Sequence, residues 1–177
     1  MKKVLIAYFS HEGEAYVGGE IVKLKIGNTR VAAQMIHGLT GGDVFRIETE
    51  KSYPDEHMET VELAKSEQNA KVRPVLKADA LKMDDYDTVI LGYPNWWGDM
   101  PMIVYNFLES YDFSEKTVIP FCTHGGSGLS GTESTIEDIT GAEMMDGFDI
   151  AGATAQNRRD KANEAVSEWL REGGFIE

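Results

Sequence analysis

Three polar segments carry the residues that could bind a ligand, and each of them follows a short apolar run. The first begins at Ser10 and reaches Gly27-Asn28-Thr29, the second is residues 94–101, and the third is residues 123–128. Small hydroxyl side chains, a glycine and a helix N-terminus offer short donors and free backbone N–H groups to a phosphate dianion. The first segment therefore favours phosphate binding, although the same residues also suit an ordinary loop that ends in a helix N-cap.

The second and third segments favour a flat ligand. Trp96 and Trp97 cannot both face the core from one strand-end loop, so we expect at least one exposed indole on which a ligand could stack. The alternative is one tryptophan in the core and one against a neighbouring loop. Residues 123–128 hold three glycines, which let the backbone come close to a flat ligand and direct N–H groups at its oxygens. His124 would add a hydrogen bond to a carbonyl of that ligand.

Other motifs near these segments do not fit their usual chemistry. Residues 126–131 match G-x-G-x-x-G, but they follow a late strand, whereas a dinucleotide fingerprint follows the first strand. A nucleophile elbow around Ser127 fails because Leu129 stands where its last glycine belongs. The sequence has neither Gly-Lys-Ser/Thr nor His-Glu-x-x-His, which disfavours a nucleoside-triphosphate loop and metal catalysis.

The elements that must position these segments follow from hydrophobic periodicity. Residues 4–9, 88–93 and 117–122 are continuous apolar runs, as expected of strands in a parallel sheet covered on both faces. Residues 43–49 and 143–151 are weaker strand candidates. Helices are indicated by apolar residues at helical spacing and by a capping-box pattern. These residues are Val31, Met35 and Leu39, then Ser130 and Glu133, then Ala162, Ala165, Val166, Trp169 and Leu170.

The alternation of strand and helix, repeated about five times, predicts a doubly wound α/β fold and a single domain over residues 1–177. In such a fold, ligands bind beyond the carboxyl ends of the strands, which is where the three polar segments lie. Residues 51–85 are polar and poorly periodic, and we interpret them as one helix with long loops.

Charge and cysteine content narrow the classes of function. The net charge of −13 disfavours nucleic acids and anionic membranes as partners. Much of it lies in residues 83–150, which hold thirteen acidic residues and only Lys116 as a base. The single cysteine, Cys122, excludes an intramolecular disulfide and a multi-cysteine metal site. No signal-peptide pattern and no apolar run long enough to span a membrane is present, so we expect a cytoplasmic protein.

In this order and combination, the three segments resemble the flavodoxin family. The resemblance rests on Tyr8-Phe9-Ser10 with Gly27-Asn28-Thr29, on residues 92–98 and on residues 123–128, and it covers the whole chain. It implies an α/β three-layer sandwich, with a five-stranded parallel sheet in the order 2-1-3-4-5 and helices on both faces. It also implies flavin mononucleotide (FMN) as the cofactor.

Carried over residue by residue, the resemblance implies the binding groups as well. The first segment would hold the phosphate through Ser10, Asn28 and Thr29, residues 94–98 would line one side of the isoalloxazine ring, and residues 123–128 would contact its pyrimidine edge. The Gly98–Asp99 peptide is similar to the one that flavodoxins rotate toward flavin N5. The expected cofactor-binding residues are Ser10, His11, Gly27, Asn28, Thr29, Pro94, Asn95, Trp96, Trp97, Gly98, Thr123, His124, Gly125, Gly126, Ser127 and Gly128.

Residues 11–26 depart from the family pattern, in which two residues separate the first Ser/Thr from the glycine of the motif. Here the gap is longer by fourteen residues. The inserted run indicates a β-hairpin that turns at Gly18-Gly19, and it resembles the insertion of a subgroup of flavodoxin-like proteins. We expect this hairpin to fold over the phosphate or the flavin and to bring Tyr16 near the ring.

On this basis the expected function is that of a low-potential one-electron carrier between redox proteins, acting as a monomer or weak dimer with a basic protein partner. One alternative is an FMN-dependent NAD(P)H:quinone or nitro-compound reductase on the same fold, which would need an open pocket over the flavin. Another is a non-enzymatic module, either without cofactor or sensing FMN, whose acidic face binds a partner directly.

Overall fold

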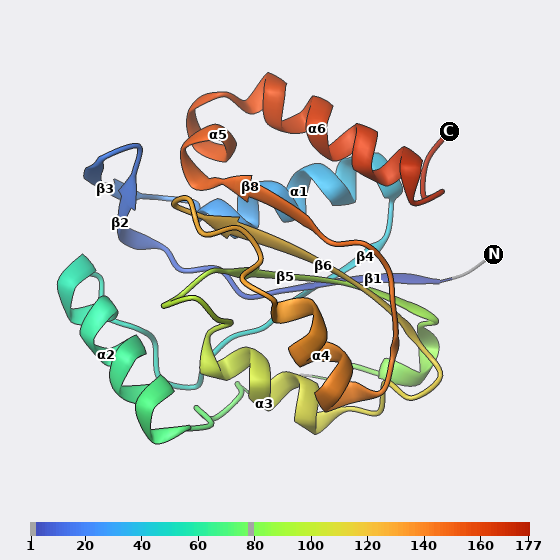
Figure 1. Ribbon diagram of the computed structural model, residues 1–177, viewed down its shortest axis with the longest axis horizontal. Coiled ribbons are helices and arrows are strands. Elements are labelled where there is room, and N and C mark those ends of the chain that lie inside the picture. Colours follow the sequence, from blue (N-terminus) through green and yellow to red (C-terminus); the bar gives the residue numbers. More distant parts are fainter. Residues whose placement is uncertain (1–2, 78–79) are drawn as a thin grey trace.

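The three continuous apolar runs form the centre of a parallel sheet, as the sequence predicts. In the computed structural model, which describes residues 3–77 and 80–177, β1 (Val4–Tyr8), β5 (Thr88–Pro94) and β6 (Thr117–His124) lie side by side. Their side chains are buried almost throughout, because helices cover both faces of the sheet (Figure 1). The three-layer arrangement implied by the family resemblance is therefore confirmed.

The order of the strands agrees with the prediction except at one edge. β4 (Asp43–Arg46) pairs with β1, so that the sheet runs β4-β1-β5-β6, which is the start of the order 2-1-3-4-5. At the fifth position, β7 (Glu143–Met144) pairs with the first part of β6 and β8 (Phe148–Ala151) with its last part. In the described part of the chain the sheet thus has six strands, where the sequence predicted five.

Pro120 in β6 explains the divided strand. The Met145 N–H donates to Val118 O at 3.1 Å, so the backbone groups of Val118 point toward the edge strand. Pro120 lies two residues further along β6, and its backbone therefore faces the same edge. A proline has no N–H to donate there. Gly147 lies against the proline ring, since a Cβ on Gly147 would be 3.0 Å from Pro120 Cγ. The chain therefore leaves the sheet between β7 and β8 instead of running straight through.

Helices cover the two faces as the periodicity predicted. The apolar stripes of residues 31–39 and 162–170 lie in two helices on one face of the sheet. The helix expected just after Ser130 begins at Thr132, but the Ser130 hydroxyl donates to Ser127 O at 3.0 Å and the N-cap is Gly131, so the predicted capping box does not form. The helices are α1 (Asn28–Thr40), α5 (Gly152–Asn157) and α6 (Arg159–Glu172) on one face, α3 (Met102–Ser110) and α4 (Thr132–Thr140) on the other, α2 (His57–Ala70) beside α3, and a short 3-10 helix, η1 (Met83–Asp85).

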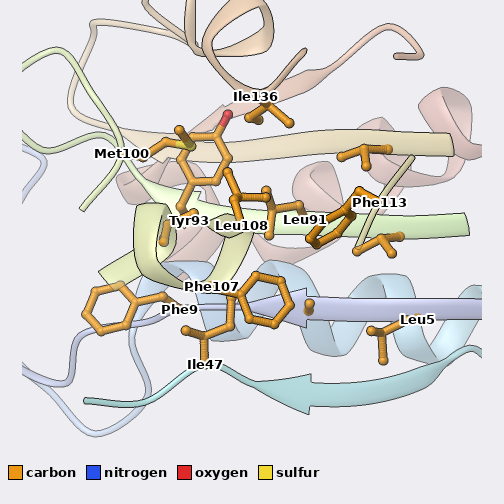
Figure 2. Packing of buried hydrophobic residues seen from close by; sticks show 14 of the residues in the cluster. Leu5, Phe9, Ile47, Leu91, Tyr93, Met100, Phe107, Leu108, Phe113 and Ile136 are labelled. Carbon is orange, nitrogen blue, oxygen red and sulfur yellow. The ribbon is translucent and has the colours of Figure 1, made fainter. Parts of the chain in front are cut away.

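Two clusters of buried side chains hold these helices to the sheet. One lies between the sheet and α3, and its members Leu91, Phe107 and Phe113 are at most 1% exposed (Figure 2). The other lies under α1 and α6 and includes Ile36 and Phe121. Burial of a side chain of this kind contributes about 1.5–3 kcal/mol. The loops at the carboxyl edge of the sheet are therefore held on a well-packed base.

Residues 11–26 form the predicted hairpin. Its strands, β2 (Gly13–Val17) and β3 (Glu20–Leu24), are antiparallel and turn at Gly18 and Gly19, whose φ angles of +61° and +92° favour glycine. In Figure 1 the hairpin stands apart from the main sheet, next to the start of α2. It is thus placed beside the strand ends where a ligand is expected.

Candidate functional site

A cleft of about 280 Å³ opens at the carboxyl edge of the sheet, and all three polar segments reach it. Its walls are the segments that follow β5 and β6, the N-terminus of α1, the hairpin and α2. The sequence-predicted site residues that line it are His11, Asn28, Thr29, Pro94, Asn95, Trp96, Trp97, Thr123, His124 and Gly125.

The remaining predicted residues are not among those that line the cleft, and two of them shape its first segment. Ser10 Oγ accepts a hydrogen bond from the Arg30 N–H at 3.1 Å, so it caps the first turn of α1 from outside the helix. Gly27 lies so close to Ser10 and His11 that a side chain on it would collide with both. The others are Gly98, Gly126, Ser127 and Gly128.

The N-terminus of α1 offers groups that suit a phosphate and a hydroxyl. The N–H groups of Asn28 and Thr29 have no partner within the helix, because they lie in its first turn. Gly27 supplies no capping side chain and that turn holds no acidic residue, so these groups suit an anion. Asn28 Oδ1 is buried and has no hydrogen-bond partner in the described part of the chain. An unpaired buried acceptor is costly, and a donor on a bound ligand would satisfy it.

Thr29 makes a contact that the sequence did not predict. Its hydroxyl lies 2.7 Å from the Thr123 hydroxyl, and both residues are buried. The pair joins the first polar segment to the third. Thr29 therefore shapes the cleft through Thr123, besides the phosphate contact that the family resemblance implies for it.

We expect Thr29→Val to destabilise the protein by about 1–3 kcal/mol, because it leaves the buried Thr123 hydroxyl without its partner. Thr29→Ser keeps the hydroxyl and is the matched control. The free energy of unfolding from urea denaturation tests this. A valine variant as stable as the serine variant would show that the pair contributes nothing.

The two tryptophans take different positions, as expected. Trp96 packs on the core, with its ring edge-on to Phe9 and Tyr53 at centroid distances of 5.4 and 5.1 Å. Trp97 is 51% exposed, and its ring lies against α2, where Nε1–H donates to Val61 O at 3.0 Å and Lys65 Nζ is 4.9 Å from the ring centroid. Both tryptophans are among the residues that line the cleft.

The turn that carries Trp97 has an unusual backbone. Trp97 and Gly98 have φ angles of +56° and +73°, and Trp96 and Asp99 exchange two backbone hydrogen bonds across them. This is a type I′ turn, in which a tryptophan is strained. The contacts of Trp97 with α2 offset that strain, and Asn95 Oδ1 accepts the Gly98 N–H at 3.0 Å. Contacts with α2 and with Asn95 thus hold Trp97 and its turn in position.

Both ring nitrogens of His124 make contacts within the protein. Its Nε2 lies 2.7 Å from Asp149 Oδ1, and its Nδ1 accepts the Gly126 N–H at 2.9 Å. Both ring nitrogens are therefore used within the protein. In this arrangement neither ring nitrogen is available for the expected hydrogen bond to a ligand carbonyl, and that hydrogen bond stays a prediction.

The hairpin is fastened to the start of α2. Glu14 accepts the His57 N–H on its Oε2 at 3.0 Å, and its own N–H donates to Asp55 O at 2.8 Å. A carboxylate at a helix N-terminus is favourable, and here it comes from a distant part of the chain. Tyr16, expected near the ring, lines the cleft and stacks on His57 with their ring centroids 6.5 Å apart.

The sequence predicted the hairpin beside the ligand, but it did not indicate the wall that α2 provides or the individual hairpin residues other than His11 and Tyr16. Helix α2 is polar and only weakly amphipathic, so it carried little signal. The one available indication was the run of small and apolar side chains at residues 60, 61 and 64 among charged neighbours. The missed lining residues are Glu14, Ala15, Leu24, His57, Thr60, Val61 and Ala64.

We expect Glu67→Gln on α2 to make the protein more stable at neutral pH. Glu67 is buried, and its Oε2 accepts a hydrogen bond from the Tyr53 hydroxyl at 3.1 Å. Burial raises the pKa of the Glu67 carboxyl above 4.5. A raised pKa in the folded state means that stability is lost as the pH rises from 4.5 through the folded value. Glutamine keeps the acceptor without the charge. Urea denaturation at pH 4 and 7 measures how far the free energy of unfolding falls between the two. The fall should be smaller in Glu67→Gln than in the wild type, and it should be unchanged in Glu62→Gln, an exposed control on the same helix.

The comparison with known protein families decides the identity of the fold. A family model described as Flavodoxin matches residues 3–170. The chain belongs to the flavodoxin family. No protein with a curated function matches it.

Solved structures agree with this membership of the flavodoxin family. A proposed flavoprotein from Bacteroides eggerthii is 26% identical with a TM-score of 0.73, over 97% of each chain. One from Bacteroides uniformis is 28% identical with a TM-score of 0.71, over 96% of this chain and 98% of that one. A Lactobacillus acidophilus flavoprotein solved in complex with FMN shares the fold at 20% identity, with a TM-score of 0.63 over 91% and 98% of the two chains.

Two other kinds of feature are absent from the part of the chain that the structure describes. In residues 3–77 and 80–177, no group of three or more His, Cys, Asp or Glu side chains is arranged to hold a metal ion. No helix in the same residues has the length and apolar character that a membrane span requires.

Proposed function

We propose that this member of the flavodoxin family binds FMN in the cleft and carries single electrons between redox proteins. The observation that carries the proposal is the convergence of three distant loops, one with a helix N-terminus and one with two indoles, on one cleft at the carboxyl edge of the sheet. The family membership and the FMN complex of the Lactobacillus acidophilus protein support FMN as the cofactor. When bound, FMN supplies the redox chemistry.

The residues of the cleft fit the chemical groups of that cofactor. The free N–H groups at the start of α1 suit its phosphate, and the unpaired Asn28 Oδ1 suits a hydroxyl of its ribityl chain. Trp96 and Trp97 offer an apolar wall to the ring system. The segment after β6 offers backbone groups at Gly125, next to the buried Thr29–Thr123 pair. The protein's own part is to bind, orient and shield the ring.

The charge of the protein favours a basic partner. Residues 83–150 hold thirteen acidic residues and one lysine, and both loops proposed to contact the ring lie within them. Complementary charge steers association and is screened over about 10 Å at 0.1 M salt. We therefore expect electron transfer to a basic acceptor to slow as the ionic strength rises.

A reductase acting on small aromatic substrates is the second candidate, because the cleft is walled on a second side by the hairpin and α2. Tyr16 and His57 stack on each other in that wall. A planar quinone or nitroaromatic compound between this wall and a bound flavin would be shielded from water, as hydride transfer requires.

Two rate measurements separate the candidates. In stopped-flow mixing with NADPH, a carrier should be reduced slowly or not at all, whereas a reductase should show rapid two-electron bleaching of the flavin. Photochemically reduced protein should then pass electrons to cytochrome c, a basic one-electron acceptor, at a rate that falls with added salt. Fast reduction by NADPH together with a salt-independent rate would overturn the carrier proposal.

A further inference from the structure

We propose that His124 and Asp149 form a clamp that holds the glycine-rich segment after β6 in its binding conformation. His124 is then a positioning residue for the cofactor, not a ligand of it. The proposal rests on the FMN site proposed above, but the clamp itself is a property of the protein without FMN. It can therefore be tested separately.

The hydrogen bonds of His124 fix the position of its proton. The Gly126 N–H can only donate, so Nδ1, at 2.9 Å from it, must be the unprotonated nitrogen. Nε2, at 2.7 Å from Asp149 Oδ1, must then carry the proton that it donates to the carboxylate. One neutral tautomer satisfies both partners. The imidazole thus joins the backbone of the segment after β6 to a side chain of β8.

The segment after β6 has little else to order it at this end. Gly125 and Gly126 have no side chains, and a Cβ on either would meet no atom within 4 Å. Gly126 has a φ of +138°, which side-chain-bearing residues rarely adopt. Glycines lose more conformational freedom on ordering than other residues. His124 is anchored as the last residue of β6, with its side chain only 10% exposed, so it can hold the flexible residues that follow.

The divided edge strand places the carboxylate. β8 re-enters the sheet after the break at Pro120 in a register that sets Asp149 opposite Cys122. Residues two apart on a strand share a face, so Asp149 lies on the same face as His124 and reaches it diagonally. The far end of the segment is held by Asn95, whose Nδ2 donates to Gly128 O at 2.8 Å. With both ends fixed, Gly125 is presented to the cleft in one conformation.

The first test is the tautomer of His124 in the protein without FMN. Nitrogen-15 NMR of the imidazole should show Nε2 protonated and Nδ1 unprotonated, with the Gly126 amide protected from exchange. In Asp149→Ala the Gly126 amide should lose that protection. The opposite tautomer in the wild type, or unchanged protection in the variant, would overturn the clamp.

The second test is the affinity for FMN itself. Asp149→Ala should raise the dissociation constant about tenfold, the factor that corresponds to ordering roughly one further residue. Asp149→Asn loses the same charge but keeps an oxygen acceptor, so it should bind nearly as the wild type does. Asp146→Ala is the control, because it removes an exposed carboxylate from the segment between β7 and β8. The hydrogen bond from Trp169 Nε1 to the backbone carbonyl of residue 146 remains in this variant.

The outcomes distinguish the two proposals. If Asp149→Ala and Asp149→Asn weaken binding equally, the acceptor oxygen that asparagine retains has no effect and the clamp is wrong. If Asp149→Ala binds FMN as tightly as Asp146→Ala does, the segment needs no clamp. If the wild type binds no FMN, the proposed function fails, and the NMR experiment alone decides the clamp.

Discussion

Replacing residues 12–25 by two glycines should weaken FMN binding about a hundredfold, or by ~2.8 kcal/mol. The substitution is geometrically feasible because Gly13 and Leu24 are paired at the base of the hairpin. It removes part of the cleft wall, including Tyr16, whose aromatic ring would otherwise be buried against the ligand. It also removes the Glu14 carboxylate from the N-terminus of α2, so that a second wall is loosened.

Titration of FMN by fluorescence measures this effect. Lys23→Gln is the control, because it changes an exposed position of the same hairpin that does not line the cleft. The melting temperature of the shortened protein without FMN shows whether the main fold survives. An unchanged dissociation constant would mean that the hairpin takes no part in binding the cofactor.

Gly92→Ala should destabilise the protein by about 3 kcal/mol and lower its melting temperature by roughly 10 °C. Gly92 lies in the middle of β5, opposite Phe121 of β6, and a Cβ there would overlap the Phe121 ring. That ring is fully buried in the cluster under α1 and α6, so it cannot move aside without disturbing its neighbours. Overpacking of this kind is among the few mechanisms with large effects on stability.

Differential scanning calorimetry, with Gly38→Ala as the matched control, tests the prediction for Gly92. Gly38 lies inside α1 with no atom within 4 Å of an added Cβ, so alanine there should stabilise the protein by about 0.5–1 kcal/mol. The double variant Gly92→Ala/Phe121→Leu should recover part of the loss. A melting temperature for Gly92→Ala within about 2 °C of the wild type would contradict the account.

The parts of the fold that could be predicted are those in which one local pattern has one structural solution. A continuous apolar run such as residues 88–93 is stable only as a strand covered on both faces, and it became β5. The stripe that ends at Leu170 suits only one side of a helix. Because ligands of such folds bind beyond the carboxyl ends of the strands, the sequence also predicted that the three polar segments lie together.

The parts that escaped prediction depend on contacts between distant residues. Helix α2 has no strong apolar stripe, and it is held by Glu14 of the hairpin and by Trp97, neither of which its own sequence indicates. The role of His124 depends on Asp149, which only the register of β8 brings within reach. The division of the edge strand was not predicted either, although Pro120 indicates it, because a proline has no N–H to donate to a neighbouring strand.

Titration of the purified apoprotein with FMN decides whether the cleft holds this cofactor. Trp96 and Trp97 line the cleft, so we expect saturable quenching of tryptophan fluorescence at one FMN per chain. The quenching should lose its Trp97 component in Trp97→Phe. A protein that is colourless as purified, and whose tryptophan fluorescence does not change on addition of FMN, would show that the cleft does not hold FMN and would favour a cofactor-free binding module.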